Sequence, residues 1–314
     1  MLSDVGEGLP DDYPTFSVII PAFNEIDDIG ACLQALSAQR WPVSEIIVVD
    51  GLSTDGTLEF LRAQEAAGRL RLVEETKRGP GAARNAGLRV ASGDAVVILN
   101  ADVLPEPDFL ERIAPHYRKG YGSVSVESRV LNLDSVIPRF IQADHELSFG
   151  GNRKGNVGWT EGFSCLREDA VATLFPDQIP VAGGEDVVFF NGLLSRGIRW
   201  TGDFSVVIPH RAPASWTGFW RQWVARGASV PHIEHTLAGM SVGRVAVRRI
   251  GAMIVEVLRG LVIVPALLAS IRCARLSGRG WRDALPFWIL IHVRTAAHRI
   301  GTLRGLGAIA RDGG

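Results

Sequence analysis

Two oxygen-bearing side chains stand one residue apart at the end of an apolar run, at Asn100 and Asp102. Residues with this spacing in an extended segment point to the same side, so both can face one ligand. Together with phosphate oxygens they can hold a hard divalent cation such as Mg²⁺ or Mn²⁺. The alternative is an ordinary Asn-x-Asp turn without a metal.

A further carboxylate, Asp50, directly follows the apolar run of residues 46–49. At the end of a strand such a carboxylate can hydrogen-bond the base or the ribose of a nucleotide, as in dinucleotide-binding folds. A simple turn residue is the alternative. Asp55, two residues before Thr57, is explained by the capping of a helix.

Glycines precede the next helical stretch, where Gly79-Pro80-Gly81 leads to Arg84. Glycines before a helix let the backbone approach a phosphate, and a helix N-terminus favours an anion. Arg84 can add a bidentate contact to a diphosphate. A plain turn beside a surface arginine is the alternative.

These residues lie between alternating strands and helices. We expect strands over residues 16–20, 45–49, 69–73 and 95–99, and helices over residues 25–38, 57–67 and 81–91. Such apolar strands, alternating with helices, predict an α/β fold with a mostly parallel central sheet covered by helices on both faces. Ligands of such sheets bind beyond the carboxyl ends of the strands, where residues 21–25, Asp50 and Asn100 lie.

Farther along the chain the pattern becomes less regular. We expect a strand over residues 123–131 and a mobile, glycine-rich loop over residues 150–158. A helix over residues 185–195 and a last strand over residues 204–209, which ends at His210, complete the predicted elements.

Five motifs, in the same order, resemble those of the family 2 glycosyltransferases, which have the GT-A fold. They are Val-Ile-Ile-Pro-Ala-Phe-Asn-Glu at 18–25, Val-Val-Asp-Gly-x-Ser-Thr-Asp-Gly-Thr at 48–57, Gly-Pro-Gly-Ala-Ala-Arg-Asn-x-Gly at 79–87, Asn-Ala-Asp at 100–102 and Gly-Gly-Glu-Asp at 183–186. The resemblance extends from about residue 17 to residue 210, about two thirds of the chain.

The resemblance implies a role for each matching residue. The donor would be held by Pro21, Ala22, Glu25, Asp50, Gly79, Arg84 and Asn100. Asp102 matches the last carboxylate of the family's DxD metal motif, while Asn100 departs from its first carboxylate and offers a neutral oxygen. His210 matches a position where related enzymes have a metal ligand, and ordinary packing is the alternative. Asp186 matches the catalytic base, with Glu185 as its neighbour.

The implied reaction is inverting transfer of a sugar from a nucleoside diphosphate donor to a hydroxyl acceptor, either lipid-linked or part of a cell-envelope glycan. Asp186 would accept the acceptor's proton, while a divalent cation and Arg84 would hold the departing diphosphate. A helix N-terminus lowers the pKa of Asp186 and burial raises it, so the sequence leaves the balance open. Nucleotidyl transfer and a catalytically silent, nucleotide-sugar-binding scaffold at the membrane are the other functions considered.

The composition excludes further classes of protein. With 314 residues, 46% of them hydrophobic, the chain can bury a large core and is neither disordered nor fibrous. A net charge of −1 excludes a polycation of the nucleic-acid-binding kind. Three widely spaced cysteines predict no disulfide framework and no zinc site, which fits a reducing cytosol. The acidic N-terminus has no apolar run like that of a secretory signal.

The charge is unevenly distributed along the chain. Residues 241–314 contain twelve arginines, no lysine and three acidic residues, a net charge of +9. Their apolar runs, 260–270 and 284–293, are too short to cross a bilayer. We expect a helical, basic region bound to the anionic cytoplasmic face of the cell membrane, peripheral or re-entrant. A helical subdomain packed on the body is the alternative.

The expected organisation is therefore an N-terminal tail over residues 1–15, a GT-A catalytic domain over residues 16–230 and a membrane-associating region over residues 231–314.

Overall fold

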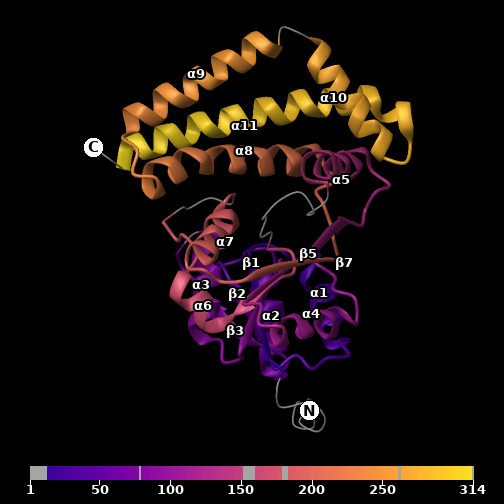
Figure 1. Ribbon diagram of the computed structural model, residues 1–314, viewed down its shortest axis with the longest axis vertical. Coiled ribbons are helices and arrows are strands. Elements are labelled where there is room, and N and C mark those ends of the chain that lie inside the picture. Colours follow the sequence, from indigo (N-terminus) through magenta and orange to yellow (C-terminus); the bar gives the residue numbers. More distant parts are fainter. Residues whose placement is uncertain (1–12, 78, 151–159, 179–182, 261–262, 313–314) are drawn as a thin grey trace. The chain divides into compact units, whose positions relative to one another are not determined.

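The computed structural model describes residues 13–77, 79–150, 160–178, 183–260 and 263–312. The chain forms two compact units (Figure 1). The first unit comprises residues 1–129, 152–177 and 185–210, and the second comprises residues 130–151, 178–184 and 211–314. The catalytic domain expected over residues 16–230 stays a prediction, and these units cut across it.

A seven-stranded sheet organises the first unit, with the strand order β3-β2-β1-β4-β6-β5-β7. Its strands are β1 (Phe16–Ala22), β2 (Glu45–Asp50), β3 (Arg71–Glu74), β4 (Ala95–Ile98), β5 (Ser123–Val130), β6 (Phe163–Leu166) and β7 (Trp200–His210). Strand β1 pairs in parallel with β2 and β4, and β2 pairs in parallel with β3. Strand β6 runs antiparallel to β4 and β5, so β1 to β5 share one direction.

Helices cover both faces of this sheet because its strands are apolar on both sides. The helices of the first unit are α1 (Ile29–Ser37), α2 (Thr57–Ala66), α3 (Pro80–Val90), α4 (Phe109–Arg118), α6 (Arg167–Thr173) and α7 (Glu185–Ser195). In β1, Val18 and Ile20 belong to the core cluster that includes side chains of α1 and α4. The intervening Ile19 belongs to the other cluster, with side chains of α3 and α7. The predicted α/β fold is confirmed.

The second unit is helical. It contains α5 (Val136–Phe149), α8 (Trp216–His232), the π-helix η2 (Ile233–Leu237), α9 (Val242–Gly260), α10 (Ile263–Leu276), the 3₁₀-helix η3 (Gly280–Asp283) and α11 (Ala284–Asp312). Helices α8 and α11 lie side by side (Figure 1). They approach closely because a side chain added at Gly301 or Gly305 of α11 would collide with carbonyl oxygens of α8.

The second unit thus has a core of its own. Phe140 of α5, Phe219 of α8 and Phe287 of α11 pack together in one cluster. The buried Arg139 donates two hydrogen bonds to Asp283, from Nε to Oδ2 over 2.8 Å and from Nη2 to Oδ1 over 3.0 Å. Part of the predicted interfacial run 284–293 contributes to this core, because Phe287 and Leu290 are buried in it.

Within the described residues, no helix is both long and apolar enough to span a membrane. Most of the loop predicted at residues 150–158 lies outside the described residues. The helix predicted over residues 185–195 is confirmed as α7, and the strand predicted over residues 204–209 is confirmed as the second half of β7.

Candidate functional site

The sheet topology brings separate segments to the carboxyl end of β4. Because β6 is antiparallel to β4, its first residue, Phe163, pairs with Ile98, the last residue of β4. The amide of Gly162 donates to the carbonyl oxygen of Ile98 over 3.1 Å. Thr160 and Glu161, which precede β6, are therefore placed beside the residues that follow β4.

His210 reaches the same region from β7. It forms an isolated antiparallel bridge with Val103, the residue after Asp102. The amide of Leu104 donates to the carbonyl oxygen of Pro209 over 2.8 Å, which fixes this pairing. The Nδ1 atom of His210 lies 3.0 Å from the hydroxyl of Ser128. The backbone segment of His210 thus lies beside the segment that contains Asp102, while their predicted role in holding a metal stays a prediction.

Arg84 of α3 joins the segments after β4 and before β6 to the start of α7. Its Nη1 donates to Oε1 of Glu185 over 2.7 Å, and its Nη2 donates to the Thr160 hydroxyl over 3.0 Å and to Oδ1 of Asn100 over 3.2 Å. Its guanidinium also lies over the ring of Phe175, 5.3 Å from the centroid. Arg84 and Glu185 are both buried. The guanidinium predicted to approach a diphosphate is therefore used here to hold protein groups.

Two glycines of the Arg84 motif are explained by packing. A Cβ atom added at Gly81 would lie 2.5 Å from the carbonyl oxygen of Pro176. One added at Gly87 would lie 2.5 Å from Cγ2 of Ile19 in the sheet. Gly79 is the N-cap of α3 with a φ of 110°, a conformation that favours glycine. The motif thus lets α3 approach the sheet closely and places Arg84 at its edge.

Acidic groups crowd around Asp102. Burial is the main factor that raises the pKa of Asp102 to about 8, and the nearby charges of Glu161 and Glu25 add to it. The Nδ2 of Asn100 donates to Oε1 of Glu161 over 3.5 Å. A divalent cation beside Asp102 would relieve this crowding of like charges.

The donor set matches a cation that shares its coordination with phosphates. No three His, Cys, Asp or Glu side chains of the described residues converge closely enough to hold a metal by themselves. Mg²⁺ and similar cations commonly use one or two protein carboxylates together with substrate phosphates. Asp102, His210 and Asn100 are the candidates for this kind of shared site, although the amide oxygen of Asn100 already accepts a hydrogen bond from Arg84.

The loops after β1 and β2 are held together by hydrogen bonds. The Asn24 amide donates to the Ser53 hydroxyl over 2.9 Å, and the Glu25 amide donates to the Thr57 hydroxyl over 2.9 Å. The buried Asp50 accepts from the amide and the hydroxyl of Ser53, over 2.8 and 2.7 Å. Asp50 thus stabilises a turn, as in the alternative interpretation given above. Its contact with a nucleoside stays a prediction.

The other residues predicted at the nucleoside lie on the same edge. Pro21 and Ala22 are the last residues of β1, and Ala22 pairs with Asp50 across the sheet. Burial, helped by the charges of Asp28 and Asp55, raises the pKa of Glu25 to about 7. A carboxyl with this pKa can donate or accept a hydrogen bond near neutral pH. Asp55 accepts from the amide of Thr57 over 3.0 Å, but it lies one residue before the N-cap of α2, which is Gly56.

Asp186 lies in the first turn of α7, next to Glu185. The Val187 amide donates to its Oδ1 over 2.8 Å. Burial and the charge of Glu185 raise the pKa of Asp186 to about 7, although Arg84 and the Val187 amide act in the opposite direction. Burial therefore outweighs the helix start, and the resulting pKa suits a general base at neutral pH.

Sequence reasoning missed Thr160 and Glu161. The sequence contains an indication of their position, because both residues precede the apolar run of β6 and so lie near the start of a strand. The run has only four residues, however, and nothing local shows that it is antiparallel to β4.

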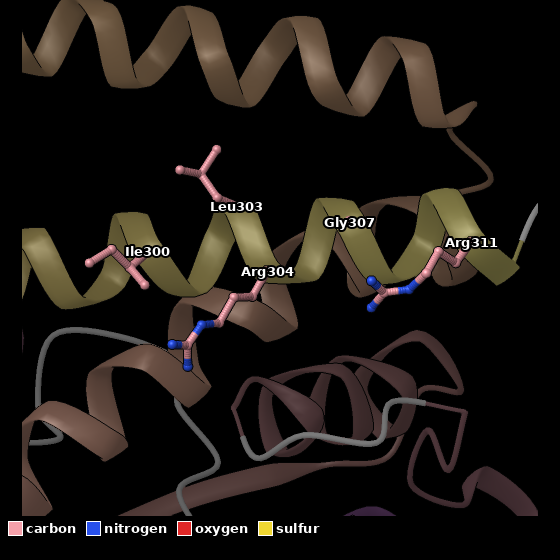
Figure 2. Close-up of a pocket in the computed structure, with 5 residues that line it drawn as sticks. All are labelled: Ile300, Leu303, Arg304, Gly307 and Arg311. Carbon is pink, nitrogen blue, oxygen red and sulfur yellow. The ribbon is translucent and has the colours of Figure 1, made fainter.

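A separate hollow of about 410 Å³ lies in the second unit (Figure 2). Its lining residues, Ile300, Leu303, Arg304, Gly307 and Arg311, all belong to α11. Figure 2 shows Leu303 on one side of the helix and the guanidinium groups of Arg304 and Arg311 on the other. Alkyl and guanidinium groups offer no general base, so this hollow is not a candidate for the chemistry of Asp186.

The sequence is similar to those of known glycosyltransferases. The family model described as "Glycosyl transferase family 2" matches residues 17–166. The chain is 42% identical over 206 residues to glycosyltransferase AglE of Haloferax volcanii, which covers 63% of this chain and 67% of that protein.

A second relative matches a shorter stretch of the chain. The chain is 34% identical over 108 residues to a Methanococcus voltae enzyme named dolichyl N-acetyl-alpha-D-glucosaminyl phosphate 3-beta-D-2,3-diacetamido-2,3-dideoxy-beta-D-glucuronosyltransferase. That match covers 33% of this chain and only 34% of the relative.

Among solved structures, the chain is similar to the mannosyltransferase PcManGT from Pyrobaculum calidifontis in complex with GDP-Man and Mn²⁺. The TM-score is 0.61 at 23% identity, and the match covers 96% of this chain and 90% of the other. At this identity the likeness concerns the fold, and it confirms the expected GT-A architecture.

Proposed function

The chain belongs to glycosyl transferase family 2, and on this premise we propose that it is an inverting, metal-dependent glycosyltransferase with a nucleoside diphosphate sugar as donor. The observation that carries the proposal is the junction at Arg84. Its guanidinium contacts Glu185, which precedes Asp186, and Asn100, which precedes Asp102 by two residues. One side chain thereby links the segment of the proposed base to the segment of the proposed metal-binding carboxylate, which supports the proposal.

In the proposed reaction, Asp186 accepts the proton of the acceptor hydroxyl as that oxygen bonds to the anomeric carbon of the sugar. The bond between the anomeric carbon and the diphosphate oxygen breaks on the opposite side, which inverts the anomeric configuration. Glu185 stays paired with Arg84 and does not take part in proton transfer. Glu25 and Asp50, at the ends of β1 and β2, are proposed to position the nucleoside.

Asp102 and His210, with the amide oxygen of Asn100, would hold a divalent cation, either Mg²⁺ or Mn²⁺. When bound, such a cation stabilises the negative charge that develops on a departing diphosphate. The crowding of Glu161 and Glu25 around Asp102 supports this assignment. The Mn²⁺ in the similar Pyrobaculum calidifontis structure is consistent with it.

For the acceptor, we propose a lipid-linked molecule or a cell-envelope glycan, met at the cytoplasmic face of the membrane. The Methanococcus voltae relative is named for a dolichyl-linked substrate, which supports the lipid-linked class. The +9 charge of residues 241–314 supports attachment to an anionic surface, peripheral or re-entrant.

The test is a panel of nucleotide sugars, assayed for nucleoside diphosphate release with membrane extracts as the source of acceptor. We expect release with one donor class, its loss in excess chelator and its recovery with Mg²⁺ or Mn²⁺. Mass analysis of lipid-extracted products should show one added sugar, and NMR should show an inverted anomeric centre. Donor binding without release for every donor and extract would instead favour the silent scaffold.

A further inference from the structure

Helix α9 carries a row of apolar side chains that faces water. Val247, Ile250 and Ile254 follow one another at intervals of three and four residues, which places them on one side of the helix. They are 76%, 47% and 56% exposed. A soluble protein normally buries such an apolar helical row in its core. An exposed row of this kind often marks a binding surface.

The opposite side of α9 makes the contacts within the second unit. Val245 packs against Leu306 and Ile309 of α11 in a small buried cluster. Arg249 donates from Nε to Oε2 of Glu234 in η2 over 2.7 Å. At 100° per residue, Val245 and Arg249 lie nearly opposite the exposed row. The helix is therefore anchored through one side and presents an apolar row on the other.

Positive charge flanks the exposed row. Arg244 and Arg248 are both exposed and lie side by side on the helix, next to Val247. Arg248 also approaches Glu234, with 3.1 Å between Nη1 and Oε1. Residues 241–255 include no Asp or Glu, so the sequence places no negative charge on this part of α9.

We propose that this face of α9 is a membrane-binding surface, which places its apolar row among the lipid chains near an anionic interface and its arginines at the lipid phosphates. The combination of an apolar row with adjacent arginines complements such an interface and not water. A second copy of the chain would present the same positive charges and would repel them. This inference rests on the proposed membrane-bound function and names the surface responsible, which is distinct from the apolar runs 260–270 and 284–293.

Vesicle sedimentation tests the proposal with the full chain. The triple variant Val247→Ser/Ile250→Ser/Ile254→Ser should lose at least about 100-fold in partitioning to vesicles of phosphatidylglycerol and phosphatidylcholine. Arg244→Gln should lose roughly fivefold at low salt and little in high salt. The matched control, Leu131→Ser/Leu133→Ser/Val171→Ser, also removes three exposed apolar side chains and should bind as the wild type does.

A spectroscopic readout reports insertion directly. The three native cysteines are buried, so a dye on Val247→Cys labels the row selectively. Its fluorescence should shift to the blue with anionic vesicles, and a dye on Leu131→Cys should not. Unchanged binding of the triple variant, or no shift at Val247→Cys, would overturn the proposal.

Two further measurements separate the alternatives. Sedimentation equilibrium without lipid should give a monomer for both the wild type and the triple variant, whereas a dimer that the triple variant abolishes would assign the row to a second copy. Calorimetry with UDP and GDP should give equal nucleotide binding by wild type and triple variant. If the wild type binds neither nucleotide, the proposed function fails independently of the vesicle result.

Discussion

The guanidinium of Arg84 donates to the carboxylate of Glu185 over 2.7 Å, and both side chains are buried. This pair joins α3 to the first turn of α7, where Asp186 follows. Arg84 also holds Asn100, so one buried cation links the segment of the proposed base to that of the proposed metal site.

The first prediction concerns the stability that this pair provides. Arg84→Gln leaves Glu185 buried without its cation, which should reduce the free energy of unfolding by about 3–5 kcal/mol. The matched control is Arg62→Gln, whose exposed pair with Glu74 has the same 2.7 Å separation. That control should cost only about 0–1 kcal/mol. Urea denaturation measures both, and equal losses would contradict the assigned role.

The second prediction concerns the pH dependence of the reaction. Since burial and Glu185 raise the pKa of Asp186 to about 7, the base form increases as pH rises toward that value. We expect kcat/KM to rise with pH below about 7 and to level off above it. Glu185→Gln removes a charge that raises the pKa of Asp186, so the rising limb should move to lower pH in the folded variant. An unmoved limb would contradict electrostatic contact between the two carboxyls.

The third prediction concerns stability and pH. The pKa of Glu25 is raised from 4.5 to about 7, so between these values the folded state binds more protons than the unfolded state. The contribution of Glu25 to the free energy of unfolding is therefore fully present below about pH 4.5 and declines as pH rises through about 7. The difference in unfolding free energy between wild type and Glu25→Gln should fall over this interval. A difference that stays constant over this interval would contradict the raised pKa of Glu25.

The fourth prediction concerns the departure at Asn100. Asn100→Asp adds a negative charge beside Asp102 and Glu161, and a higher charge count strengthens binding of a hard cation. Calorimetry with Mn²⁺ in the presence of UDP or GDP should show roughly tenfold tighter cation binding. Asn100→Ala should weaken it. Cation binding that is the same in all three proteins would show that this position does not contact the metal.

The fold was predictable where local pattern and tertiary structure agree. The apolar strands β1, β2 and β4 and the helix α7 lie close to their expected bounds. Strand β6 was not predicted because its four residues give a weak signal and it is antiparallel to its neighbour β4. Helix α4 was also missed, although its Phe109 and Ile113 are buried in the core.

The candidate site was predictable as a list of residues but not as a set of contacts. Residues at strand ends follow from the sheet, and so Asp50, Asn100 and Asp102 were found. The buried position of Arg84 depends on Glu185, 101 residues later in the chain, and no local pattern reveals such a partner. Glu161 lies near both Asp102 and Asp186 for the same reason, because the antiparallel pairing of β6 places it there.

The central claim is tested most directly by the transfer rate of Asp186→Asn at saturating donor, with nucleotide binding measured on the same preparation. As the proton acceptor, Asp186 should be essential for turnover but not for donor binding. We expect transfer to fall by about 10²–10⁴-fold while the Kd for the nucleotide stays unchanged. Asp108→Asn, the same change at the start of α4, should transfer as the wild type does. Near-normal turnover by a folded Asp186→Asn protein would contradict the account.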